Sequence, residues 1–163
     1  MLGCSAGGHL AASIGVNWQE KWLAEKVGVK QDWLKPAGMI LCYPVITSGE
    51  FAHRGSFDML TKGQESEELL EELSLEKHVS EHTPETFIWH TVTDTCVPVE
   101  NSLFFVSALH QHNVPVEFHL YPVGHHGLST ADKLTQNTDG SGIQEQCQTW
   151  LPLLRTWLED RAW

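Results

Sequence analysis

Residues 3–12 read GCSAGGHLAA, and this stretch carries the most informative motif of the chain. Gly3, Ser5 and Gly7 fit the Gly-x-Ser-x-Gly pattern of a strained strand-to-helix turn, in which small residues flank a serine whose hydroxyl projects from the backbone. The residues after Gly7 have the small, apolar composition of a helix that packs tightly against a sheet. The pattern alone arises easily by chance, and a small-residue turn is the alternative interpretation. The rest of the chain must therefore supply a sheet and partners for the serine.

Three short, continuous apolar runs predict strands that are covered on one or both faces. These runs are residues 39–43, 86–90 and 116–121. Longer segments with helical spacing lie between and after them. Those segments are residues 10–26, 67–78, 101–112 and 143–159. The alternation predicts an α/β fold with a mostly parallel sheet flanked by helices, and Pro152 is expected to bend or divide the last helix.

Size and charge restrict the class of protein. The chain has 163 residues and a mass of 18.3 kDa, which is the size of a single domain, so residues 1–163 are predicted to form one domain. Ten Lys and Arg face twenty-one Asp and Glu, and the formal net charge of −11 disfavours nucleic acid and anionic membranes as partners. No apolar run approaches the roughly 18 residues of a membrane span.

Cysteines and histidines give no sign of a metal site. The four cysteines lack the paired spacing of a zinc site and are too few for a disulfide scaffold, so reduced thiols in a cytoplasmic protein without a secretory signal are expected. His78 and His82 have the i, i+4 spacing of two ligands on a helix. Pro84 ends any helix there, and neither a metal nor another cofactor is expected.

A serine needs a general base, and the base needs an acid that orients it. Asp94 lies just past the second predicted strand, and His125 and His126 lie just past the third. All three fall at the carboxyl ends of strands, where open α/β sheets collect their sites. Three other aspartates compete with Asp94 by residue type alone, since none follows a predicted strand: Asp58, Asp132 and Asp139.

Four blocks of sequence resemble, in the same order, the α/β-hydrolase esterase/lipase family, specifically its acetyl-xylan-esterase-like and bacterial feruloyl-esterase-like branch. The blocks are GCSAGGHLA at 3–11, CYPVI at 42–46, WHTVTDTCVPVENS at 89–102 and YPVGHHGL at 121–128. The resemblance covers nearly the whole chain. It implies that Ser5 is the nucleophile, Asp94 the acid and His126 the base of a catalytic triad, and that the backbone N–H of Ala6 is one donor of the oxyanion hole. His126 is favoured because the family's histidine directly precedes a glycine, and His125 stays as the alternative because it stands where the family usually has glycine.

The resemblance implies hydrolysis of carboxylic esters through an acyl-enzyme, with a small-molecule or sugar ester as substrate and acetyl esters of sugars as one candidate. Two alternatives stay open. A serine peptidase of the prolyl-oligopeptidase-like type uses the same triad, and an inactive truncated remnant or interaction module retains the residues without the activity.

The family also carries a His-Gly-Gly-Gly-type segment and several strands upstream of the serine turn, whereas only Met1 and Leu2 precede Gly3. By resemblance, the chain is expected to be about the carboxyl-terminal three fifths of a hydrolase, without the strand that enters the turn, the earlier strands and the second oxyanion donor. An exposed sheet edge would favour self-association. The chain alone is therefore expected to be poorly stable and weakly active or inactive.

Overall fold

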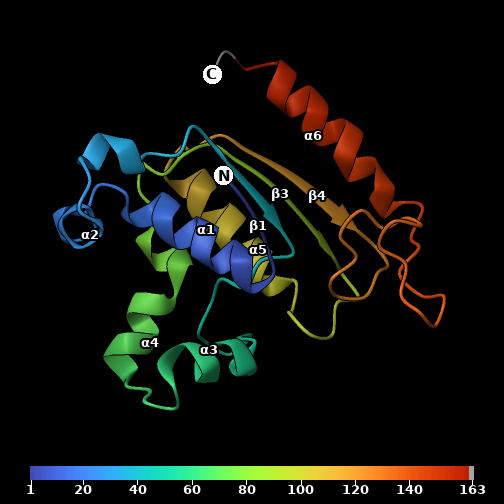
Figure 1. Ribbon diagram of the computed structural model, residues 1–163, viewed down its shortest axis with the longest axis horizontal. Coiled ribbons are helices and arrows are strands. Elements are labelled where there is room, and N and C mark those ends of the chain that lie inside the picture. The colour runs from blue at the N-terminus through green and yellow to red at the C-terminus, as the bar shows by residue number, and fades with distance from the viewer. Residues whose placement is uncertain (162–163) are drawn as a thin grey trace.

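The computed structural model describes residues 1–161 and contains a sheet of four parallel strands in the order β1-β2-β3-β4 (Figure 1). The strands are β1 (Leu2–Cys4), β2 (Met39–Cys42), β3 (Thr86–Thr91) and β4 (Val116–Tyr121). One row of the register pairs Leu2 with Ile40, Ile40 with Phe87 and Phe87 with Glu117. The predicted parallel α/β sheet is confirmed, and the carboxyl ends of all four strands meet at one edge of it.

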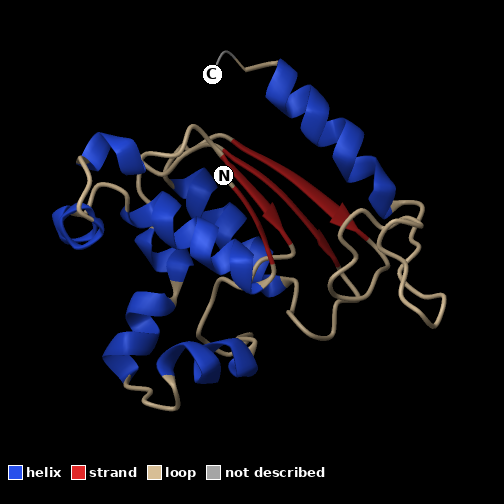
Figure 2. Cartoon of the chain, in the orientation of Figure 1, coloured by secondary structure: helices blue, strands red, loops and turns tan. Residues whose placement is uncertain are grey.

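Helices connect the strands and cover both faces of the sheet. They are α1 (Ala6–Asn17), α2 (Lys21–Val27), α3 (Arg54–Thr61), α4 (Glu67–Leu73), α5 (Glu100–Gln111) and α6 (Trp150–Glu159), with 3₁₀ turns at Gln31–Leu34, Leu75–His78 and Cys147–Thr149. In Figure 2, α6 stands alone on one side of the strands and the other helices lie on the opposite side or beyond it. Among residues 1–161, no helix combines the length and the apolarity that crossing a membrane requires.

Two of the predicted helices end earlier than their patterns suggest. The segment 10–26 forms two helices, α1 and α2, and α1 already begins at Ala6, directly after the serine turn. The segment 67–78 is divided at Ser74, whose hydroxyl accepts a hydrogen bond from the backbone N–H of Ser48 at 3.0 Å. Ser74 is buried, and its side chain bonds to the loop that contains Ser48 while helix α4 ends.

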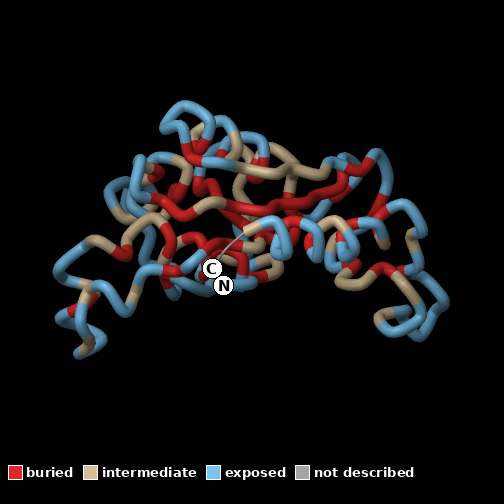
Figure 3. Tube along the Cα trace, turned by 90° about the horizontal axis from the view of Figure 1, so that it is seen from above, coloured by how far each residue is buried: buried red, intermediate tan, exposed pale blue. Residues whose placement is uncertain are grey.

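The alternation of side chains along β2 divides the core into two parts, one on each face of the sheet. Met39 and Leu41 pack with residues of α1 and α5. Ile40 and Cys42 pack on the other face with residues of α6. Figure 3 shows the buried residues concentrated along the strands between these layers.

Helix α6 packs on the sheet through one stripe of apolar residues. Trp150, Leu154 and Trp157 are buried, whereas Leu158 remains 38% exposed. Pro152 does not divide the helix, which is continuous from Trp150 to Glu159. It lies in the first turn of α6, where a backbone N–H has no intrahelical partner, so its missing N–H costs the helix no hydrogen bond.

A short strand does enter the serine turn, which corrects the expectation that this strand is lacking. β1 pairs with β2 over its three residues. The Met1 carbonyl accepts a hydrogen bond from the N–H of Ile40 at 2.8 Å, and the Met1 amino group donates to the Gly38 carbonyl at 2.7 Å. Leu2 is 53% exposed at this edge of the sheet, and self-association through the edge stays a prediction.

Candidate active site

Ser5 lies in a strained turn between β1 and α1. Its backbone has φ 54° and ψ −123°, a conformation that a residue with a Cβ rarely adopts. The Ser5 N–H donates to the Cys42 carbonyl at 3.0 Å, and the Ser5 carbonyl accepts from the N–H groups of Gly8 at 2.9 Å and Val45 at 3.1 Å. These bonds anchor both sides of the strained residue to β2, the loop after it and α1.

Close backbone approach explains two of the glycines around Ser5. A Cβ at Gly3 would lie 2.2 Å from the Gly7 carbonyl oxygen, and a Cβ at Gly8 would lie 2.6 Å from the Pro44 Cβ. A Cβ at Gly7 would meet no atom within 4 Å. The crowding that the motif suggests therefore applies to Gly3 and Gly8, and Gly7 has open space around it.

The structure brings the three predicted site residues together at the carboxyl edge of the sheet. Ser5 Oγ lies 2.7 Å from His126 Nε2, and His126 Nδ1 lies 2.6 Å from Asp94 Oδ2. Asp94 comes from the loop after β3, and His126 comes from the loop after β4. His125 is exposed, and its Nδ1 donates to the His126 carbonyl at 2.6 Å. The His125 imidazole thus contacts the backbone of this loop, whereas the His126 imidazole contacts Ser5 and Asp94.

Asp94 is held as a buried carboxylate. Its side chain is completely buried, and Oδ1 accepts hydrogen bonds from the N–H groups of Cys96 and Val97, each at 2.9 Å. Burial acts to raise the pKa of Asp94, but the hydrogen bonds from His126, His90 and the Val97 N–H outweigh it and hold this pKa well below its usual range. Asp94 is therefore ionised at neutral pH and can orient the imidazole of His126.

Hydroxyl groups join the acid loop to the base loop, which the sequence motifs did not predict. Thr91 Oγ1 donates to the Gly124 carbonyl at 2.8 Å, and Thr93 Oγ1 donates to the same carbonyl at 3.0 Å. The Gly124 N–H donates back to Thr93 Oγ1 at 2.9 Å. The Tyr43 ring lies edge-on to the His126 ring, with centroids 5.1 Å apart. Both threonines stand within three residues of Asp94, but only the fold places Gly124 beside them.

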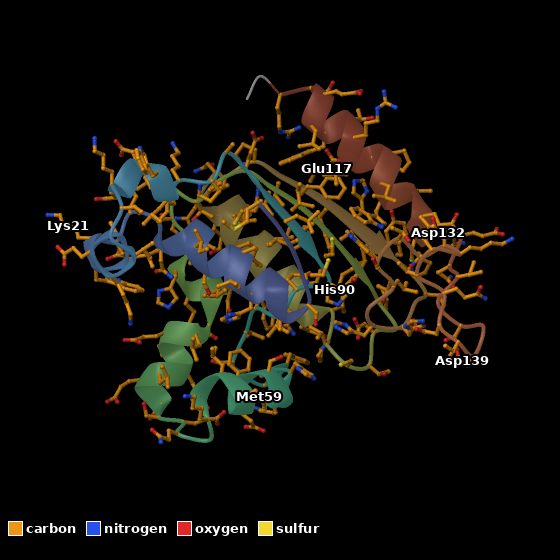
Figure 4. All side chains as sticks on the ribbon, in the orientation of Figure 1. Lys21, Met59, His90, Glu117, Asp132 and Asp139 are labelled. Carbon is orange, nitrogen blue, oxygen red and sulfur yellow. The ribbon has the colours of Figure 1, made fainter. Side chains whose placement is uncertain are left out.

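The competing aspartates lie elsewhere. Asp58 is exposed on α3. Asp132 Oδ1 accepts from the N–H of Leu134 at 2.9 Å, and Asp139 Oδ1 accepts from the hydroxyl of Ser141 at 2.7 Å. Figure 4 shows Asp139 at the outer end of its loop, far from the strand ends where His90 lies. Asp132 and Asp139 therefore stabilise their own turns.

An apolar cavity of about 490 Å³ borders the serine turn at Ala6. Its lining includes His9 and Leu10 of α1, Phe57 of α3 and Leu73 at the end of α4. Ala6 is the first residue of α1, so its N–H belongs to the first turn, where N–H groups have no intrahelical acceptor. Neither Ser5 nor His126 is among the residues that line this cavity.

Comparison with known proteins assigns this chain to a family. Residues 1–109 match the model of the BD-FAE family. Endo-1,4-beta-xylanase B of Butyrivibrio fibrisolvens is 38% identical over an alignment of 137 residues, which covers 81% of this chain and 21% of that protein.

Solved structures of a bifunctional hydrolase and a carboxylesterase are also similar to this chain. An acetyl ester-xyloside bifunctional hydrolase from Caldicellulosiruptor lactoaceticus matches 94% of this chain and 56% of its own, at 39% identity and a TM-score of 0.71. A carboxylesterase from Lactobacillus plantarum WCFS1 matches 98% of this chain and 57% of its own, at 29% identity and a TM-score of 0.80.

The chain thus spans about a fifth of the xylanase and a little over half of each esterase structure. The predicted resemblance and the predicted α/β-hydrolase fold are both confirmed. The chain belongs to the BD-FAE family of α/β-hydrolase esterases.

Proposed function

We propose that this chain hydrolyses carboxylic esters with Ser5 as nucleophile, His126 as general base and Asp94 as the acid that orients the base. The observation that carries the proposal is the continuous series of contacts from Ser5 Oγ to His126 at 2.7 Å and from His126 to Asp94 at 2.6 Å. An ionised Asp94 accepts the Nδ1–H of His126. The lone pair on Nε2 then faces the Ser5 hydroxyl and can take its proton.

The reaction follows from this arrangement in two steps. Ser5 Oγ bonds to the acyl carbon as its proton passes to His126 Nε2, and the N–H of Ala6 donates to the carbonyl oxygen as it becomes negative. The tetrahedral intermediate expels the alcohol, which takes the proton from Nε2 and leaves the acyl group on Ser5. A water molecule then gives a proton to His126 Nε2 and attacks the acyl carbon. The bond between this carbon and Ser5 Oγ breaks, Ser5 Oγ takes the proton back from Nε2, and the carboxylic acid is released.

The proposed substrate is a small acyl ester, with acetyl groups on sugars as the candidate. The printed names of two relatives support this class, since one is an acetyl ester-xyloside bifunctional hydrolase and the other is a xylanase.

The test is the release of phenol from an aryl acetate, compared with cleavage of a peptide anilide. The rate expected for the chain alone is low, so the measured quantity is the part of the rate that depends on Ser5. We expect Ser5→Ala to reduce acetate hydrolysis to the uncatalysed background and the anilide to stay intact. Equal rates for the wild type and Ser5→Ala would contradict the proposal, and Ser5-dependent cleavage of the anilide alone would favour a peptidase.

A further inference from the structure

His90 is a buried histidine that the proposed reaction does not use directly. It lies on β3, four residues before Asp94, and its side chain has no exposed surface. Its Nδ1 lies 2.7 Å from Ser102 Oγ at the start of α5. Its Nε2 lies 3.0 Å from the Val97 carbonyl and 3.3 Å from Asp94 Oδ2. Both ring nitrogens are thus engaged, and one of them faces the proposed catalytic acid.

The partners of His90 determine where its proton lies. The Val97 carbonyl can only accept a hydrogen bond, so Nε2 carries the hydrogen. In the neutral ring Nδ1 then has a lone pair, and the Ser102 hydroxyl donates to it. The same nitrogen lies 3.3 Å from Asp94 Oδ2, so the hydrogen that bonds to the Val97 carbonyl also lies close to a carboxylate oxygen.

We propose that His90 is a positioning residue for Asp94: its Nε2–H holds Oδ2 in the orientation that His126 requires, and Ser102 fixes the His90 ring. The inference rests on the proposed function. It extends that function by a residue that contacts neither the substrate nor Ser5.

The two oxygens of Asp94 differ in how they are held. Oδ1 accepts from two backbone N–H groups of its own loop, at Cys96 and Val97. Oδ2 faces His126, which gains and loses a proton during the proposed reaction, and His90, which takes no part in that transfer. His90 therefore offers Oδ2 a donor that is constant through the cycle. The hydrogen bond from His90 is also among the causes that lower the pKa of Asp94.

Val97 links Asp94 and His90 through its backbone groups. Its N–H donates to Asp94 Oδ1, while its carbonyl accepts from His90 Nε2. The carboxylate is thus tied to β3 through its own loop and through the His90 side chain. A purely structural role in the core between β3 and α5 is the competing explanation, so the experiment must separate orientation of Asp94 from stability.

The experiment compares His90→Leu with His90→Gln in the full chain. Leucine removes both ring nitrogens at similar volume, whereas the glutamine amide can again donate from near the Nε2 position. Removal of one hydrogen bond to a charged group is expected to lower kcat for the aryl acetate about 10- to 100-fold, with KM within about twofold, and His90→Gln is expected to restore most of kcat. His119→Leu is the matched control, because this histidine on β4 bonds to Glu117.

A second variant and a second readout guard against misfolding. Ser102→Ala leaves His90 in place but frees its ring, and it is expected to lower kcat about two- to tenfold. The far-downfield ¹H NMR signal of the proton between His126 Nδ1 and Asp94 Oδ2 reports the contact without any turnover. We expect this signal in the wild type, His90→Gln and His119→Leu, and its loss in His90→Leu under conditions in which that variant is still folded.

Two results would overturn the positioning role. One is a His90→Leu protein that keeps the wild-type kcat and NMR signal. The other is a loss of activity in His90→Leu that matches its unfolded fraction and that His90→Gln does not recover. A wild type that hydrolyses no ester would refute the proposed function instead, and the NMR signal would then decide the role of His90 by itself.

Discussion

Ser5 combines a left-handed backbone with a side chain, and the glycines around it make this geometry fit. Gly3 and Gly8 allow β1, α1 and the loop after β2 to approach closely, whereas Gly7 has open space around its Cα. The Gly-x-Ser-x-Gly pattern predicts the turn but not which glycine is sterically required. Gly3 is required because of the Gly7 carbonyl, and Gly8, which lies outside the pattern, is required because of Pro44, which reaches it only in the folded chain.

Alanine substitutions at Gly3 and Gly7 test this distinction within one motif. Gly3→Ala places a Cβ against the Gly7 carbonyl, and we expect it to lower the free energy of unfolding by about 1–3 kcal/mol or more. Gly7→Ala adds a methyl group in open space within a helix and is expected to be neutral or to stabilise by up to about 1 kcal/mol. Urea unfolding measures both, and an equal loss in the two variants would contradict the steric account.

His9 is a single residue that makes the stability of the fold depend on pH. It is buried, with its Nε2 bonded to the Leu73 carbonyl at 3.0 Å. Burial lowers the pKa of His9 despite that carbonyl and the charge of Glu76. The unfolded chain therefore binds a proton first, and stability is lost as pH falls from about 6.5 through the lower folded pKa.

The change in urea midpoint between about pH 7.5 and pH 5.5 measures this effect. His9→Gln, which keeps a donor but does not titrate in this range, is expected to lose less stability on acidification than the wild type. His82→Gln, at a side chain that is 51% exposed, is the control and should retain the wild-type drop. A wild-type drop in His9→Gln would show that other groups cause it.

At the scale of elements, the strands were more predictable than the helix ends. The sequences of β2 and β3 are short and largely apolar, and β4 alternates apolar residues with Glu117 and His119, so their positions follow from composition and pattern. Helix α4 ends where Ser74 turns inward to bond to Ser48, a contact between residues 26 positions apart that no local pattern reveals. β1 was missed because it is very short. Three residues are too few for a pattern, and pairing with β2 makes them a strand.

The packing of α6 predicts unequal costs for two leucines of the same helix. Leu154 is 8% exposed and packs in the core on this face of the sheet, whereas Leu151 is 38% exposed. We expect Leu154→Ala to cost about 2–5 kcal/mol and Leu151→Ala less than about 1 kcal/mol. Denaturant midpoints measure the difference, and similar losses at both positions would contradict this placement of α6.

At the scale of the whole molecule, the parallel sheet explains how residues from three distant blocks meet. Ser5, Asp94 and His126 each follow a strand, and parallel strands bring their carboxyl ends to one edge. The sequence placed Asp94 and His126 just past predicted strands, and the family resemblance named all three residues as a triad. The sequence did not predict the roles of His90 and Thr93, because their partners Ser102 and Gly124 lie on other elements, and only the assembled sheet fixes those distances.

The most direct test of the central claim is covalent labelling with a fluorophosphonate, read by intact mass and peptide mapping. A serine activated by a base reacts with this probe, whereas an ordinary serine does not. We predict one adduct on Ser5 in the wild type and in His125→Ala, and a loss of labelling in Ser5→Ala and His126→Ala. Labelling that persists in Ser5→Ala, or that depends on His125 and not on His126, would contradict the account.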